Sequence, residues 1–381
     1  MKQLFQVRMP QEVICGEGTI QHLEKIGRRH QKAVIFTDKG VHAAGLTEEP
    51  RRLLEQVGCK VKVIDGIPAE PSYGQVQEIM DQFLEEQADV IIAIGGGSVM
   101  DTAKLASMAV KGEKIQDYVD NPLLGKKRTQ SVMIPTTAGT GSEATPNSIV
   151  LVPEQELKVG IVNPEMIADI VILDGNMIRR LPLKIAASTG IDALAHSIEC
   201  FTSNKANDFS NMYALAALKL IFRNLVEACT NADNIEAKNK MLLAAFYGGV
   251  AITASGTTAV HALSYPLGGK YHIAHGVANA ILLTPVMRFN KDACLDEFSV
   301  VYDEVCGRGN LGKEEKAEWV IREMESMVKK LEIPQNLNSF GVNKDDLEDL
   351  VNAGLQVKRL LNNNKKTVTA EDARAIYSQV M

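Results

Sequence analysis

The chain has 381 residues, of which 45% are hydrophobic and 23% charged, which is typical of a globular protein long enough to form two domains. Its formal net charge of −6 and its lack of an apolar run of bilayer length argue against nucleic-acid and membrane partners. The six cysteines have no CxxC spacing and the first residues lack a signal-peptide core, so we expect reduced thiols in a cytoplasmic protein.

Strands alternate with helices over roughly the first 180 residues, which is the pattern of an open parallel sheet. The third strand is apolar throughout, as expected of a strand that is buried on both faces. The predicted strands span residues 33–38, 61–65, 88–94 and 131–135, and helices between them span 74–86 and 99–110.

The character of the chain changes after Leu181-Pro182, where strand-like runs become rare. Long segments with helical periodicity follow at 211–230 and 235–253, and residues 307–347 are charged and helical, as on a solvated surface. We therefore predict an α/β N-terminal dinucleotide-binding domain over residues 1–181. An all-α C-terminal metal-binding and catalytic domain would span residues 182–381.

A glycine-rich turn, Ile94-Gly-Gly-Gly-Ser98, follows the buried strand and opens the next helix. Glycines let a backbone approach an anion closely, and the free N–H groups of a helix N-terminus favour phosphate. The turn is not the GxGxxG fingerprint, and a plain strand-to-helix turn is an equal alternative when it is taken alone.

Two further features favour a dinucleotide. The loop Thr136-Thr-Ala-Gly-Thr-Gly-Ser-Glu143 follows the next strand and is rich in hydroxyls and glycines. Asp38 ends the first strand, where a carboxylate can bind ribose hydroxyls and repel a 2′-phosphate, which favours NAD over NADP. The alternative for Asp38 is a turn or helix-cap residue before Gly40.

Four side chains could together hold a metal ion: Asp192, His196, His261 and His275. Asp192 and His196 are four residues apart in a helical segment and therefore share a face. Imidazole and carboxylate suit iron or zinc, and an unpaired Asp192 in an apolar segment would be costly. Taken singly, each could instead be a core residue whose hydrogen bonds are made within the protein, or one member of a hydrogen-bonded pair on a helix surface.

Three imidazoles and one carboxylate can leave a coordination position open for an oxygen ligand. A metal beside a nicotinamide suggests hydride transfer between nicotinamide C4 and a carbon whose oxygen the metal polarises. His272, three residues before His275, would then be a fifth ligand or a proton relay.

These motifs resemble the iron-containing alcohol dehydrogenases (group III) of the dehydroquinate synthase-like superfamily, over essentially the whole chain. The resemblance is carried by Gly95-Gly-Gly-Ser-x-x-Asp101, Pro135-Thr-Thr-Ala-Gly-Thr-Gly-Ser-Glu143, Gly190-Ile-Asp-Ala-Leu-Ala-His-Ser-Ile-Glu199 and His275-Gly-x-x-Asn279-Ala280. This chain departs from many members in having Ala274 in place of proline, and from several diol reductases in having Tyr265 in place of histidine.

The resemblance implies Fe(II), with zinc as the alternative, bound by Asp192, His196, His261 and His275. It implies a homodimer in which a strand around residues 5–10 pairs across the interface, and an active site between the two domains. His272 would lie near the nicotinamide and the substrate. The implied NAD(H) contacts are Asp38, Gly95, Gly96, Gly97, Ser98, Asp101, Thr136, Thr137, Thr140, Asn147 and Lys158.

We therefore expect an iron-dependent, NAD(H)-linked alcohol dehydrogenase or aldehyde reductase that acts on a small aldehyde or primary alcohol. A zinc-dependent enzyme like glycerol dehydrogenase or dehydroquinate synthase is one alternative, and a metal- or nucleotide-binding regulator without turnover is another. Lys270 could attract an anionic aldehyde, or it could be a surface lysine at a helix end.

Overall fold

The structure is a computed structural model that describes residues 5–153 and 157–381. By its internal contacts the chain divides into two compact units, each described here by itself. The α/β unit comprises Arg8–Thr137 and Gly141–Arg180, and the helical unit comprises Leu181–Met381, Ala138–Thr140 and the segment that ends at Val7. The expected domains 1–181 and 182–381 stay a prediction about folding units.

The α/β unit is built on a six-stranded sheet in which every strand pair is parallel, in the order β1-β8-β5-β4-β2-β3. An antiparallel hairpin of two further strands stands apart from this sheet. The α/β fold class predicted from the alternation of strands and helices is confirmed. The sheet strands are β1 Glu12–Cys15, β2 Lys32–Phe36, β3 Lys60–Ile64, β4 Val90–Gly95, β5 Gln130–Pro135 and β8 Ile170–Leu173, and the hairpin strands are β6 Asn147–Val152 and β7 Leu157–Val162.

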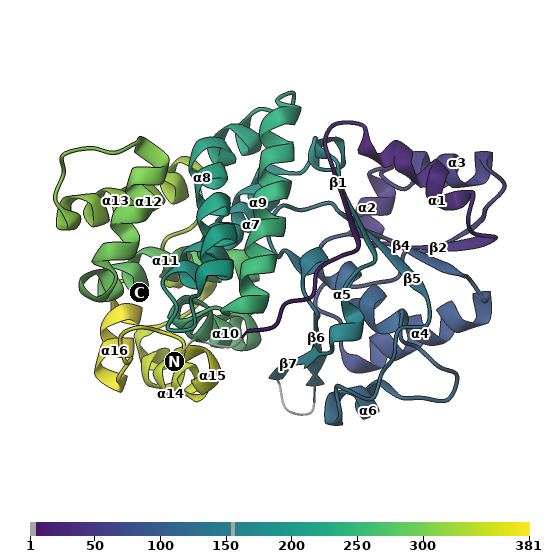
Figure 1. The fold of residues 1–381 in the computed structure, drawn as a ribbon. Helices are drawn as coiled ribbons and strands as arrows, with labels where there is room; N and C mark the ends of the chain where they lie inside the picture. Colours follow the sequence, from purple (N-terminus) through teal and green to yellow (C-terminus); the bar gives the residue numbers. More distant parts are fainter. Residues whose placement is uncertain (1–4, 154–156) are drawn as a thin grey trace. The chain divides into compact units, whose positions relative to one another are not determined.

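Helices cover both faces of this sheet (Figure 1). Alternate residues of each strand face opposite sides, so Ile35 and Ile92 join one core with Leu53. Phe36 lies on the other face, where its ring meets Phe83 edge-to-face at 5.8 Å. The helices are α1 Leu23–Gly27, α2 Lys39–Ala43, α3 Glu48–Gln56, α4 Tyr73–Glu86, α5 Gly97–Ala106 and α6 Ile115–Asp120.

The four predicted strands and two predicted helices of this unit form, with bounds that differ from the expected ones by at most four residues, the largest difference being the end of α5 at Ala106. Residues 5–10, expected to form a strand across a dimer interface, form no strand in the single chain, where the first strand of the described residues begins at Glu12. Phe5 instead lies 5.9 Å from Phe209, ring to ring. The pairing of this segment with a second subunit stays a prediction.

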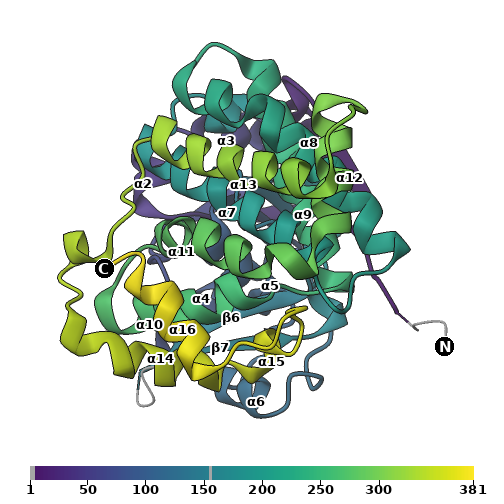
Figure 2. The ribbon, with the colours of Figure 1, turned by 90° about the vertical axis from the view of Figure 1, so that its left-hand side faces the viewer.

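The helical unit packs long helices side by side, with α7 in contact with α8, α9 and α11 (Figure 2). The long helices predicted from periodicity are confirmed. Its helices are α7 Leu183–Phe201, α8 Asp208–Thr230, α9 Ile235–Ala254, α10 Ala259–Tyr271, α11 His275–Asn290, α12 Leu295–Cys306, α13 Lys313–Lys330, α14 Leu347–Gln356, α15 Lys358–Leu361 and α16 Ala370–Ser378.

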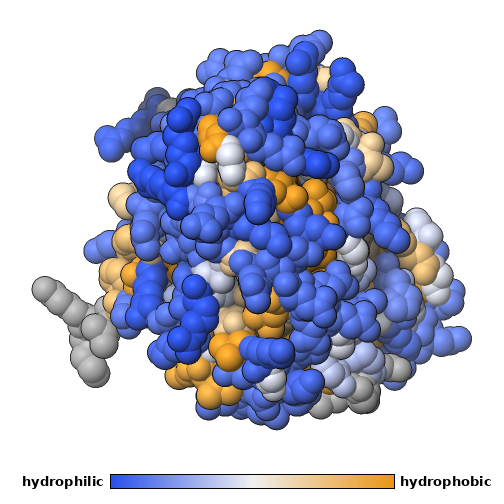
Figure 3. Space-filling view, turned by 90° about the vertical axis from the view of Figure 1, so that its right-hand side faces the viewer, coloured by the Kyte–Doolittle hydropathy of each residue, from blue (hydrophilic) through white to orange (hydrophobic). Residues whose placement is uncertain are grey.

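The face of the molecule in Figure 3 is mainly hydrophilic, with apolar residues in small separate patches. Within the described ranges, no single helix has the length and apolarity to cross a membrane; α9 and α10 meet that test only as a pair bent by 104°.

Candidate metal centre and cofactor loops

The four predicted metal ligands converge in the helical unit. One potential ligand atom from each of Asp192, His196, His261 and His275 lies within 4.8 Å of all the others. The Asp192 Oδ1 atom is 3.9, 3.7 and 3.6 Å from the Nε2 atoms of His196, His261 and His275, respectively. Asp192, His196 and His261 are buried, and His275 is the most exposed of the four.

The ligands come from the three helices α7, α10 and α11, and two local features of the backbone place them. In α7, Asp192 and His196 are one turn apart and therefore face the same side. Between α10 and α11, His272 adopts the left-handed conformation, with φ of 53°. This residue ends α10 and lets the chain reverse within three residues, so that His275 starts α11.

Two glycines allow backbone to approach α7 closely. A Cβ atom at Gly276 would lie 2.3 Å from the Ser188 carbonyl oxygen, so the first turn of α11 needs glycine there. A Cβ atom at Gly139 would lie 2.7 Å from the Thr189 carbonyl oxygen. The Gly139 carbonyl in turn lies 3.4 Å from His196 Nδ1, so this close approach gives the ligand an outer partner.

Glu199, also on α7, contacts the Nδ1 atom of His261, and sequence reasoning did not single it out. It is fully buried, and its Oε1 atom accepts hydrogen bonds from Thr258 N, Thr258 Oγ1 and Val260 N at 3.1, 2.7 and 2.7 Å. Its Oε2 atom makes a short contact with His261 Nδ1. A proton on Nδ1 leaves the Nε2 lone pair of His261 facing the other ligands, as metal binding requires.

Burial raises the pKa of Glu199 to about 7, against the opposing effect of its hydrogen bonds. Burial alone would also raise the pKa of Asp192, but the three imidazoles and Asn279 outweigh it and lower the pKa. Burial, with the neighbouring imidazoles, lowers the pKa of His261 well below its usual value. An ionised carboxylate and neutral imidazole are the donors that a divalent transition metal takes, so these residues fit such an ion.

The predicted cofactor loops lie at one edge of the sheet of the α/β unit. Strand β4 lies between β2 and β5, so the carboxyl ends of these strands, which carry Asp38, Gly95 and Thr136, are adjacent. The chain reverses its direction of travel across the sheet between β2 and β4, which is where such folds bind ligands. The Thr136 N–H donates to the Gly95 carbonyl at 3.0 Å.

Asp38 caps helix α2, because its Oδ1 atom accepts from Val41 N at 2.9 Å. The structure thus bears out the cap alternative, and the contact with ribose stays a prediction. Gly96 precedes α5, and a Cβ atom there would meet only the Thr137 side chain, at 3.6 Å. Gly97 and Ser98 form the first turn of α5 and offer its N–H groups to an anion.

Asp101 faces the interior of the unit, where its carboxylate accepts from Ser142 Oγ, Ile149 N and Lys104 Nζ at 2.5, 2.9 and 3.0 Å. Lys104, which sequence reasoning missed, is fully buried and also bonds Asn147 O at 2.6 Å. Burial lowers the pKa of Lys104, and Asp101 opposes this effect. The pair therefore ties α5 to the start of β6.

The remaining predicted cofactor residues lie on different parts of the chain. Lys158, on β7, forms an ion pair with Glu70 at 2.5 Å. Glu70 has a positive φ of 51°, and its N–H donates to Ser98 Oγ at 3.0 Å. This chain of contacts links β7 to the glycine-rich turn. Asn147 begins β6, and Thr140 belongs to the helical unit.

Comparison with known proteins places this arrangement in a family. Residues 10–175 match the model described as "Iron-containing alcohol dehydrogenase", and residues 186–381 match "Fe-containing alcohol dehydrogenase family, C-terminal". The chain belongs to the iron-containing alcohol dehydrogenase family. The long-chain-alcohol dehydrogenase 1 of Geobacillus thermodenitrificans is 33% identical over 363 residues, 94% of this chain and 91% of that protein.

Solved structures of the family share the fold over the full length. A 1,3-propanediol oxidoreductase has a TM-score of 0.91 at 28% identity and covers 100% of both chains. The sulfoacetaldehyde reductase of Bifidobacterium kashiwanohense, solved with NAD+, has a TM-score of 0.89 at 26% identity and covers 99% of both. The chain is thus an oxidoreductase of the alcohol dehydrogenase class, which confirms the predicted family and enzyme class.

The sequence left two alternatives open for each of His272 and Lys270, which lie near the ligands in the chain. Within the described chain, the group of converging ligand atoms does not include His272, which is exposed, so its expected role as a fifth ligand has no support. Lys270 is half exposed and pairs with Asp349 and Asp346 at 3.1 and 3.4 Å. Its charge is compensated, as in the surface alternative. The ring of Tyr265 lies 6.1 Å from the ring of His275.

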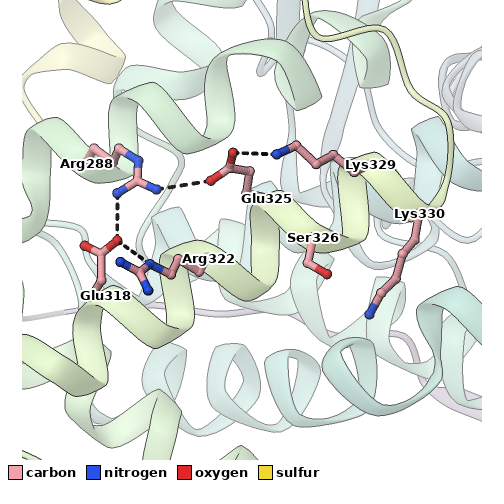
Figure 4. Close-up of a pocket in the computed structure, with 7 residues that line it drawn as sticks. All are labelled: Arg288, Glu318, Arg322, Glu325, Ser326, Lys329 and Lys330. Atoms are coloured by element: carbon pink, nitrogen blue, oxygen red, sulfur yellow. Dashed lines mark hydrogen bonds and ion pairs between the residues drawn. The ribbon is translucent and has the colours of Figure 1, made fainter.

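A surface pocket of the helical unit is lined mainly by charged side chains that pair with one another (Figure 4). Its acidic side chains are paired: Glu318 bonds Arg288 and Arg322, each at 3.0 Å, and Glu325 bonds Arg288 and Lys329 at 3.1 and 3.0 Å. The hydrogen bond from Arg288 leads the effects that lower the pKa of Glu318 to about 2. This network ties α11 to α13 and offers no reactive group. The pocket is lined by Arg288, Glu318, Arg322, Glu325, Ser326, Lys329 and Lys330.

Proposed function

We propose that this protein is an Fe(II)-dependent, NAD(H)-linked alcohol dehydrogenase or aldehyde reductase that acts on a small aldehyde or primary alcohol. The convergence of Asp192 Oδ1 with three imidazole nitrogens at a buried point carries the proposal. Family membership supports it, as does the NAD+ bound in the structure of a relative. We also propose a homodimer, as the family resemblance implies.

The proposed reaction balances as aldehyde, NADH and one proton giving alcohol and NAD+. When bound at Asp192, His196, His261 and His275, a divalent ion supplies Lewis acidity toward the substrate oxygen. The chain contributes a single carboxylate to this ligand set, and its buried helices keep water from three of the four side chains. His272, exposed beside the ligand segment, is proposed to exchange the proton with solvent.

The α/β unit is proposed to bind the dinucleotide through the residues predicted from the sequence. The N–H groups at the start of α5, from Gly97 and Ser98, suit the pyrophosphate. Asp38 keeps its Oδ2 atom for ribose hydroxyls while Oδ1 caps α2, which favours NAD over NADP. Lys158 would have to exchange its ion pair with Glu70, whose N–H donates to Ser98 Oγ, for a contact with the dinucleotide.

The test is a metal reconstitution with a substrate panel. Protein stripped of metal is reloaded with Fe(II) or Zn(II), and NADH oxidation is followed with neutral and anionic short aldehydes. We expect turnover that is lost on stripping and restored by Fe(II), and that is absent in Asp192→Asn. Full activity without metal would refute the proposed function. Higher activity with Zn(II) would refute the iron assignment alone.

A further inference from the structure

Lys104, on α5, is a fully buried side chain outside the residues predicted from the sequence. Its Nζ atom donates to Ser142 Oγ, Thr145 Oγ1 and the Asn147 carbonyl oxygen at 2.7, 3.2 and 2.6 Å. A fourth contact joins it to the carboxylate of Asp101, one helical turn earlier, at 3.0 Å. Because an ammonium group has three N–H donors, these four oxygens engage all of them.

The partners of Lys104 beyond α5 lie in the segment 142–149, which joins the hydroxyl-rich loop to β6. Asp101 holds the same segment, because its carboxylate accepts from Ser142 Oγ and Ile149 N at 2.5 and 2.9 Å. All of these residues belong to the α/β unit. The pair of Asp101 and Lys104 therefore fixes this segment against one turn of α5.

The segment 142–149 and α5 both carry proposed contacts with the dinucleotide. The first turn of α5 would bind the pyrophosphate, and Lys104 lies about two turns further along the same helix. Asn147 is a predicted cofactor residue, and its backbone carbonyl is the closest partner of Lys104. At the other end of the hydroxyl-rich loop, Thr136 N donates to the Gly95 carbonyl in the glycine-rich turn. Both ends of the loop are thus fixed to α5 or to the turn before it, and Lys104 supplies the contact at the second end.

The cost of burying this pair indicates a role other than stability. Burial lowers the pKa of Lys104 and Asp101 opposes this effect, so desolvation works against the attraction between the two charges. Apolar side chains of similar volume often replace a buried ion pair without loss of stability. They cannot replace its direction, because the N–H groups of Lys104 select particular oxygens of the segment 142–149. Lys238 offers a comparison, since it is also buried but lies in the helical unit, where it donates to the Ala228 carbonyl.

We propose that Lys104 is a positioning residue for the dinucleotide: it fixes the segment 142–149 against α5 and so sets the place of Asn147 relative to the phosphate-binding turn. The proposal rests on the proposed NAD(H)-linked function, and it assigns Lys104 no contact with dinucleotide or substrate. Without these hydrogen bonds, the segment would adopt several arrangements in the free protein. The dinucleotide would then have to order it on binding, which lowers affinity without changing the reacting groups.

The test compares Asp101→Asn with the double variant Asp101→Asn/Lys104→Met. The double variant removes both charges, so that no uncompensated charge stays buried, and methionine keeps most of the length of the lysine side chain. Any direct role of Asp101 is the same in both proteins, and the difference between them therefore reports Lys104. Lys238→Met is the matched control, since it removes a buried lysine of the helical unit.

Fluorescence titration of the metal-free proteins with NADH gives Kd, and steady-state kinetics with Fe(II) give KM and kcat. Chelator competition gives the metal affinity, and circular dichroism and Tm report the fold. We expect the double variant to bind NADH about tenfold more weakly than Asp101→Asn, because ordering one or two residues costs that much affinity. KM for NADH should rise in parallel, with kcat, metal affinity and Tm nearly unchanged. Lys238→Met should leave Kd for NADH unchanged.

Equal NADH affinity of the folded double variant and Asp101→Asn would overturn the positioning role, as would a loss confined to Tm. If the double variant does not fold, Thr145→Val removes one oxygen from Lys104 and keeps the size of the side chain. It should weaken NADH binding about 2–10-fold, the effect of one hydrogen bond, and unchanged affinity would overturn the role there too. A wild-type protein that binds no NADH would refute the proposed function, whereas equally tight binding by wild type and the variants would refute the role of Lys104 alone.

Discussion

Replacing Gly276 with alanine tests how the start of α11 is held against α7. The added Cβ atom would lie 2.3 Å from the Ser188 carbonyl oxygen and 2.7 Å from its carbonyl carbon, both backbone atoms that no rotamer change can move. Ordinary carbon contacts begin near 3.5 Å, so the first turn of α11 must shift by about 1 Å. Overpacking of this kind costs about 1–3 kcal/mol, and the gain in helix propensity returns at most about 1 kcal/mol.

We therefore expect Gly276→Ala to lower the stability of the helical unit by about 2 kcal/mol, or about 4–8 °C in Tm. His275 adjoins this residue, and metal sites tolerate deviations of only about 0.2 Å, so Fe(II) affinity should fall by about tenfold or more. Thermal denaturation of the metal-free protein and chelator competition measure the two effects separately.

Gly74→Ala is the matched control, because Gly74 is also the second residue of its helix, α4. A Cβ atom at Gly74 would meet only Ser72 Oγ, at 3.9 Å, which is an ordinary contact. This control should leave Tm unchanged or raise it slightly. If Gly276→Ala matched Gly74→Ala in both Tm and metal affinity, the backbone clash with Ser188 would not limit the site, and the reasoning would be wrong.

Three further substitutions have defined outcomes. Glu199→Gln should weaken metal binding about 10–100-fold with little change in fold. A glutamine that keeps its oxygen on Thr258 turns its NH2 toward His261 Nδ1, and this donor selects the tautomer whose proton is on Nε2. Unchanged metal affinity in chelator competition would contradict this. Lys270→Met should leave KM unchanged for both anionic and neutral aldehydes, since the lysine is already paired with two carboxylates. A rise in KM for the anionic aldehydes alone would instead support a role of Lys270 in substrate binding. Glu318→Gln should cost about 1 kcal/mol at pH 7 after allowance for partial exposure. The lowered pKa of Glu318 makes this contribution present above pH 4.5 and lost as pH falls toward 2, so urea denaturation should show the two proteins converging over that range, and a constant difference would refute the ion-pair origin.

Much of the fold is determined locally and could be predicted. Short-range patterns of apolar and polar residues decide which side chains an element buries. The elements predicted from such patterns at 88–94, 211–230 and 235–253 are present in the structure. The short strand β1 was missed because its exposed residues carry no such pattern. Strand β8 escaped for another reason: four apolar residues are too few to separate a strand from a helix turn.

The candidate ligands could also be predicted from the sequence, because residue type and the four-residue spacing of Asp192 and His196 are local properties. The contacts of the neighbouring residues could not be predicted in this way. Whether Lys270 faces a substrate or a pair of surface carboxylates depends on α14 and the turn before it, more than 70 residues later in the chain. Asp38 likewise proved to be a helix cap, which depends on backbone angles that the next residues adopt.

The sequence by itself determined which chemistry this protein can carry: one carboxylate and three imidazoles, a glycine turn and a hydroxyl-rich loop. Only the tertiary structure decided how these groups are held. Glu199 contacts His261, and Asn279 contacts Asp192, across 62 and 87 residues of chain. The physical reason is that a buried donor or acceptor takes whatever partner the packing of separate helices brings within 3 Å or so, and no pattern in the linear chain encodes that approach.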